Sequence, residues 1–109
     1  MSIMTAEGLA TPEDVVFRRF APDLDAALRK GEALFPARVA ELSATGVLLD
    51  FGDRAGCPDL PQQAVVIIPA LGQYKARRAW RDGARAAYLF ELTEFSIRAL
   101  DALLKDRFD

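Results

Sequence analysis

Few residues of this 109-residue chain have the type and spacing that catalysis needs. There is no histidine, which removes the usual general base and the commonest metal ligand. The one cysteine, Cys57, has no second cysteine for a disulfide or a zinc site and no histidine to activate it. The carboxylates are scattered, and no pair of them is placed for acid–base work. We therefore expect a binding protein rather than an enzyme, with no metal ion and no cofactor.

One group of cations has a regular spacing. Lys75, Arg77 and Arg81 fall on one face of an expected strand, with Ala76 and Trp80 on the other face. The simplest interpretation is a solvated strand face with Trp80 in the core. The alternative is a basic strip that binds nucleic acid. The net charge of −2 and the lack of an aromatic row on the basic face disfavour that alternative.

The composition is that of one folded domain. Hydrophobic residues make up 51% of the chain and charged residues 28%, and 109 residues are enough for a single core. Residues 1–11 are expected to form a flexible leader before a domain at 12–109. This leader lacks the basic and apolar regions of a signal peptide, and the longest apolar stretch is interrupted by Pro69. We expect a cytoplasmic protein that does not enter a membrane.

The elements that must position any site are mostly expected to be strands. Thr11 and Pro12 predict the start of a short helix that reaches about Phe20. The segment 23–30 fits either a helix or a strand that ends in a turn at Lys30 and Gly31. Alternating residues and turn signals then predict strands over 32–42, 47–51, 64–68, 73–81 and 84–91.

The first hairpin and the last element have the clearest patterns. Residues 32–51 predict a hairpin that turns at 43–46, and a strict period of two puts Arg38, Ala40 and Leu42 on the face opposite Glu41. From about residue 94 to 107 the period is that of a helix, with Thr93 as its cap and an apolar stripe formed by Ile97, Leu100, Leu104 and Phe108. These elements predict a mainly β fold, a small antiparallel barrel closed by a C-terminal helix.

The sequence around this hairpin resembles the PilZ family, whose members are small β-barrel receptors for cyclic diguanylate (c-di-GMP). The family pattern D/N-x-S-x-x-G appears here as Glu41-Leu42-Ser43-Ala44-Thr45-Gly46, with glutamate in the first place. Flanking segments match as well: residues 36–39 before the motif, 47–49 after it, and 68–72, 79–83 and 87–90 further on. The resemblance covers about residues 18–108 and implies a PilZ-like barrel of about six strands.

The family's second motif, R-x-x-x-R, is altered in this chain. Arg18 and Arg19 resemble its start, but the register gives Arg19-x-x-x-Asp23, with an aspartate where the second arginine belongs. The same alignment makes residues 24–29 the first barrel strand. Losing one charge-assisted hydrogen bond costs about 1.5–3 kcal/mol, and the carboxylate of Asp23 adds repulsion toward phosphates.

The resemblance implies a stand-alone signalling module that binds cyclic diguanylate and relays the signal to a partner protein. Its implied ligand-binding residues are Arg18, Arg19, Glu41, Ser43 and Gly46. We expect weak binding, which replacing Asp23 by arginine should strengthen at least about tenfold. The alternative is a PilZ-like adaptor that has lost the nucleotide and binds proteins, and a lesser alternative is a small-barrel nucleic-acid binder.

Overall fold

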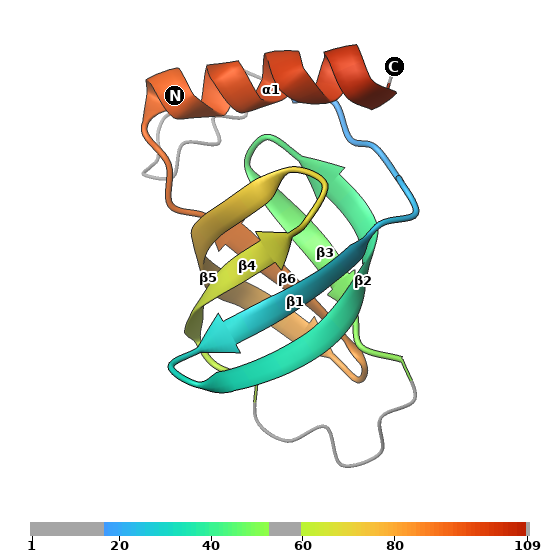
Figure 1. The fold of residues 1–109 in the computed structure, drawn as a ribbon, viewed down its shortest axis with the longest axis vertical. Helices are drawn as coiled ribbons and strands as arrows, with labels where there is room; N and C mark the ends of the chain where they lie inside the picture. The colour runs from blue at the N-terminus through green and yellow to red at the C-terminus, as the bar shows by residue number, and fades with distance from the viewer. Residues whose placement is uncertain (1–16, 53–59, 109) are drawn as a thin grey trace.

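The computed structural model describes residues 17–52 and 60–108, which form a closed β-barrel with one helix across one end (Figure 1). The strands follow the order β1-β2-β3-β6-β5-β4, and every neighbouring pair is antiparallel. Pairing of β1 with β4 closes the barrel. The elements are β1 (Asp25–Lys30), β2 (Ala33–Ser43), β3 (Gly46–Asp50), β4 (Gln63–Ile68), β5 (Gly72–Asp82), β6 (Arg85–Phe90) and α1 (Glu94–Phe108).

Tight turns fix the register of the hairpins, largely where the sequence predicts them. The segment that allowed a helix or a strand is strand β1, and Gly31 takes a φ of 61° in the turn that follows it. Ala44 and Thr45 join β2 to β3. The last hairpin turns at Gly83 and Ala84, with Gly83 at a φ of 62°. Positive φ in short hairpin turns is the conformation that glycine adopts without strain.

Two β-bulges interrupt the regular alternation of the long strands. In β2 the register shifts between Val39 and Glu41, so Ala40 is the extra residue. In β5 it shifts between Arg78 and Trp80. The strict period of two that the sequence predicts is therefore wrong beyond both bulges. Because of the first bulge, Leu42 turns into the barrel and Glu41 stays exposed.

The core fills the inside of the barrel and the space under α1. Inward side chains from the strands are almost completely buried, among them Leu28, Leu49, Val66, Ile68 and Tyr88. The helix adds Ile97, Leu100 and Leu104 from one face, as its 3.6-residue pattern predicts. Thr93 caps it: the Ser96 amide donates to Thr93 Oγ1 at 3.1 Å. The mainly β fold with a docked C-terminal helix is confirmed.

The chain enters the barrel beside the end of β2. Residues 17–19 are not helical, so the predicted helix up to Phe20 is wrong at that end. Instead, Phe20 pairs with Leu42 through two backbone hydrogen bonds of 2.8 Å, and its ring lies 6.0 Å from that of Phe108. The expected leader, the start of the expected helix and Cys57 lie outside the described residues. In the described part, no helix is long and apolar enough to cross a bilayer.

Candidate functional site

A shallow hollow of about 230 Å³ lies on the outer surface of the barrel over β3 and β6. Small and aliphatic residues form its floor, Gly46 and Leu48 from β3 and Ala87 and Leu89 from β6. Glu41 and Ser43 of β2, Ala79 and Trp80 of β5, and Arg19 from the segment before β1 also line it. A floor of small side chains with polar groups and an aromatic ring around it suits a flat ligand that carries charge.

The two bulges explain why this part of the surface carries the hollow. Each lies in a strand beside the β3–β6 pair, and a bulge bends its strand and re-aims the side chains that follow it. Glu41 and Ser43 therefore share the outer face. Trp80 also points outward and is 49% exposed, so the prediction of a core tryptophan is wrong.

The second bulge also divides the expected basic strip. Lys75 and Arg77 precede the bulge and are exposed, whereas Arg81 follows it and pairs with Ala86, whose side chain is fully buried. The side chain of Arg81 donates to the carbonyl of Gly83 at 3.1 Å. The three cations do not share a face, because the extra residue reverses the alternation after it.

The turn between β2 and β3 is held by its own side chains. Ser43 Oγ accepts a hydrogen bond from the Thr45 amide at 3.2 Å and lies 3.1 Å from Thr45 Oγ1. A Cβ on Gly46 would lie 2.6 Å from the carbonyl oxygen of Tyr88 in β6, closer than real contacts allow. Gly46 is therefore needed where β3 crosses close to β6, whatever ligand the hollow takes.

The two neighbouring arginines lie in different places. Arg19 lines the hollow, and its Nη1 lies 3.8 Å from Glu41 Oε1, with both side chains half or more exposed. Such a pair contributes little to stability, so Arg19 can exchange Glu41 for a ligand. Arg18 does not line the hollow, and its guanidinium lies 5.5 Å from the centre of the Phe20 ring.

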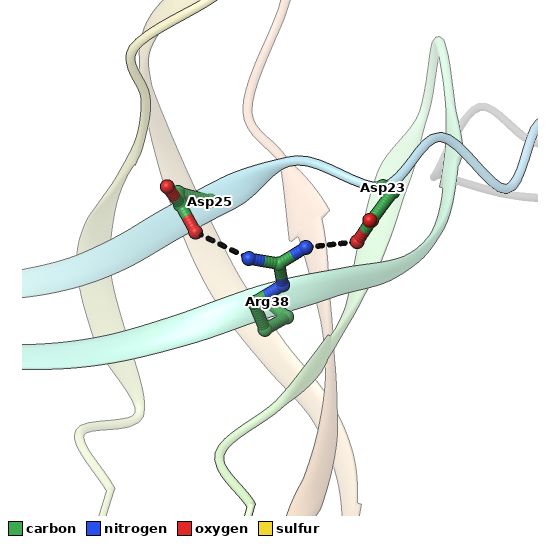
Figure 2. A network of polar contacts seen from close by, with 3 residues as sticks. All are labelled: Asp23, Asp25 and Arg38. Carbon is green, nitrogen blue, oxygen red and sulfur yellow. Dashed lines mark hydrogen bonds and ion pairs between the residues drawn. The ribbon is translucent and has the colours of Figure 1, made fainter.

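Asp23, which stands where the motif has its second arginine, lies in a polar network with Arg38 and Asp25 (Figure 2). Arg38 of β2 reaches across to β1, pairing with Asp23 through Nη2 and with Asp25 Oδ1 through Nη1 at 2.7 Å. The hydrogen bond and charge of Asp23, followed by those of Asp25, raise the pKa of Arg38 further above its ordinary value. Asp23 does not line the hollow, and its carboxylate shares the guanidinium of Arg38 with Asp25.

Four of the five residues predicted to bind a ligand therefore meet at one hollow: Arg19, Glu41, Ser43 and Gly46. Arg18 is the exception. Sequence reasoning missed Trp80 as a member of the site. The signal was present in the resemblance, since residues 79–83 match a later family strand, but strict alternation assigned the ring to the core.

Comparison with solved structures identifies the fold. The barrel and helix superpose on the PilZ domain of CeSA from a cellulose-synthesizing bacterium with a TM-score of 0.58 and 16% identity, over 81% of this chain and 98% of that one. The chain has a PilZ fold. An uncharacterized Legionella protein matches with a TM-score of 0.59 and 14% identity, over 84% of this chain and 94% of that one. No family model matches the sequence, and no curated protein does. The PilZ fold that the motifs imply is thus confirmed by structure.

Proposed function

We propose that this protein is a PilZ-type signalling module, a binding protein that takes cyclic diguanylate weakly at the hollow over β3 and β6 and relays the signal to a partner. The observation that supports this proposal is the meeting of Arg19, Glu41, Ser43 and Gly46 around one hollow that also includes Trp80. These residues come from three separate parts of the chain. An ordinary hairpin turn needs neither the arginine nor the tryptophan.

Three side chains around the hollow have a chemistry that suits a guanine nucleotide. The guanidinium of Arg19 matches the adjacent O6 and N7 acceptors of guanine, or a phosphate. The carboxylate of Glu41 can accept the N1–H and amino donors at the other edge of the base. The exposed ring of Trp80 offers a face for stacking, which contributes about 1–3 kcal/mol per base in proteins that bind single strands.

Two features make the expected binding weak. Position 23 carries a carboxylate instead of a second guanidinium, and a missing charge-assisted hydrogen bond costs about 1.5–3 kcal/mol. Arg18, which could replace it, packs on Phe20 away from the hollow. Among the described residues that line the hollow, one arginine is thus left to meet two phosphates and two bases. We expect micromolar or weaker affinity, with a marked dependence on salt because the site is open to water.

Calorimetric titration with cyclic diguanylate tests the proposal. Arg19→Ala should abolish the binding, and Trp80→Ala should weaken it about tenfold. Arg98→Ala is the matched control, since it removes an exposed arginine that is likewise paired with one carboxylate, at 3.1 Å from Glu94 on α1. Tight binding that Arg19→Ala leaves intact would place the ligand elsewhere on the protein.

The second candidate function is an adaptor with a PilZ fold and no nucleotide. The observation that favours it is the use of Asp23 in a network with Arg38 and Asp25, which ties position 23 to the barrel wall instead of to a ligand. If the unmutated protein gave no heat of binding at millimolar nucleotide while showing a normal melting curve, this would become the leading function.

A further inference from the structure

The basic side chains of the described residues fall into two groups. Most of them make a hydrogen bond, an ion pair or a ring contact within the described part of the chain. Four make none with another described residue: Arg29, Lys30, Lys75 and Arg77. All four belong to β1 and β5, the two strands on either side of β4. The cations that pair with no other described residue are thus gathered on the two strands beside β4.

The strand registers place two of these cations, Arg29 and Lys75, among outward apolar side chains. Arg29 of β1 pairs with Leu34 of β2 on one side and with Val65 of β4 on the other, and Val65 pairs with Lys75 of β5. Along this row, which crosses four strands, apolar and cationic side chains therefore alternate: Leu34, Arg29, Val65 and Lys75. All four point outward, because the residues beside them in the strands, such as Leu28, Val66 and Ala76, are buried.

We call this surface the β1–β4 face and define it by Arg29, Leu34, Val65, Ile67, Lys75 and Arg77. It covers the side of the barrel turned to the viewer in Figure 1, where β1, β2 and β4 lie. Leu34 is 57% exposed, and Val65 and Ile67 are partly exposed. Glu91 lies beside Lys75, to whose carbonyl its amide donates, but the two side chains form no ion pair within the described residues. Within the described residues, no carboxylate therefore forms an ion pair with the cations of this face.

We propose that the β1–β4 face docks an acidic amphipathic helix of a partner protein. Neighbouring strands are about 4.8 Å apart, so the row alternates between apolar and cationic groups at about that spacing. Residues three or four apart on a helix are separated by about 5 Å along its axis. A helix can lie across the strands with leucine-like and acidic residues alternating every three or four positions. Its leucine-like residues then contact the apolar residues of the face, and its carboxylates pair with the cations. This inference rests on the proposed function in one respect, since a module that relays a signal needs a partner protein.

The arrangement suits a protein better than a membrane or a nucleic acid. A surface that binds a membrane buries its apolar side chains in the lipid while its cations stay at the headgroups. On this face the apolar side chains and the cations alternate within one row of outward residues. Binding of single-stranded nucleic acid uses aromatic side chains for stacking, and the β1–β4 face has none. Trp80 belongs to the hollow over β3 and β6.

Amide chemical shifts of the full-length protein, recorded without nucleotide, test the inference. The probe is an alanine-based helical peptide whose one face alternates leucine and glutamate every three or four residues, and a peptide with lysine for glutamate is its counterpart. The glutamate peptide should shift amides of β1, β4 and β5 in a saturable, salt-sensitive way, and the lysine peptide should not. Because no nucleotide is present, the two proposals are tested separately. A peptide that does not bind says nothing about nucleotide binding, and a protein that binds no nucleotide can still bind the peptide.

Variants then assign the contact. Arg29→Ser/Lys75→Ser/Arg77→Ser should weaken peptide binding about tenfold or more, since three exposed pairs of about 0.5 kcal/mol each add up to that factor. Val65→Thr/Ile67→Thr should weaken it severalfold. Arg85→Ser/Arg98→Ser/Lys105→Ser is the control, because it removes the same charge from cations that already have carboxylate partners. The inference is overturned if this control weakens binding equally, if shifts lie elsewhere, or if phosphatidylglycerol vesicles or an oligothymidylate bind the face more tightly than the peptide.

Discussion

The outer surface over β3 and β6 and the β1–β4 face are flanked by the same two long strands, β2 and β5, and yet differ in shape and charge. The halves of β2 and β5 beside β3 and β6 contain the bulges, and the surface there is hollowed. The halves beside β1 and β4 pair regularly, and their outward residues form straight rows. One extra residue in each strand therefore distinguishes the hollowed surface from the regularly paired face.

The two surfaces also differ in how their cations are balanced. On the hollowed side Arg19 pairs with Glu41 and, nearby, Arg85 pairs with Asp50 at 3.3 Å. On the β1–β4 face Arg29, Lys75 and Arg77 have no such partner among the described residues. Local pairing suits a site that exchanges a carboxylate for a small ligand. Unbalanced charge suits a surface that a larger acidic partner covers.

The largest expected effect comes from a substitution that destabilises the folded barrel, on which both surfaces depend. Leu100 is a buried residue of α1, and Leu100→Asp places a carboxylate in this apolar contact without a partner. Unfolding should become easier by about 3 kcal/mol or more, which lowers Tm by roughly 10 °C or more in a domain of this size. Ala102→Asp, at an exposed position of the same helix, is the control in thermal melts followed by circular dichroism. If the Tm of the Leu100→Asp protein stayed at that of the control, α1 would not dock on the barrel.

A smaller effect should separate the two surfaces. Gly46→Ala forces a methyl group against the Tyr88 carbonyl, so β3 must move away from β6 under the floor of the hollow. We expect a loss of about 1–3 kcal/mol in denaturant unfolding, together with loss of nucleotide binding. Binding of the acidic peptide to the β1–β4 face should survive.

The control for this prediction is another glycine-to-alanine change. Gly31 lies in the β1–β2 turn, and no atom lies within 4 Å of the place that a methyl group there would occupy. Gly31→Ala therefore strains the backbone, which has a φ of 61°, without touching the hollow. It should lower stability and leave nucleotide binding intact. Equal loss of nucleotide binding in both variants would mean that general destabilisation, and not the β3–β6 contact, explains the result.

The sequence predicts the positions of the strands and the helix well, and it predicts less well which strand residues point outward. Turn residues and periods located β2 through β6 and α1 to within about two residues, because glycine turns and amphipathic stripes are local signals. The pattern left β1 open between helix and strand, and only the family resemblance made it a strand. The bulges at Ala40 and Ala79 are not local signals, since alanine fits a regular strand equally well. They accompany the burial of Leu42 and Ala86 inside the closed barrel, and the second one places Trp80 on the outer face.

The candidate site was predicted from motif resemblance more than from residue chemistry. The turn motif identified Glu41, Ser43 and Gly46, and Arg19 came from the damaged motif. The pairing of Asp23 with Arg38 could not be predicted, since it depends on the register of β1 with β2 across 15 residues. This pairing changes what a substitution at position 23 should do.

The smallest expected effect is therefore at Asp23, and the pair it forms with Arg38 sharpens the prediction from sequence. Two changes would strengthen nucleotide binding in Asp23→Arg: removal of a repelling carboxylate and addition of a guanidinium. Because the carboxylate is ion-paired with Arg38 and does not line the hollow, the first contribution should be small. Asp23→Ser, which tests that contribution alone, should change the calorimetric affinity less than about threefold, whereas Asp23→Arg should raise it about tenfold through one added charge-assisted hydrogen bond. Arg38 keeps Asp25 as a partner in both variants, so the barrel wall should remain folded. An equal gain in both variants would show that repulsion by Asp23 dominates despite Arg38, and no gain in Asp23→Arg would show that position 23 does not reach the ligand.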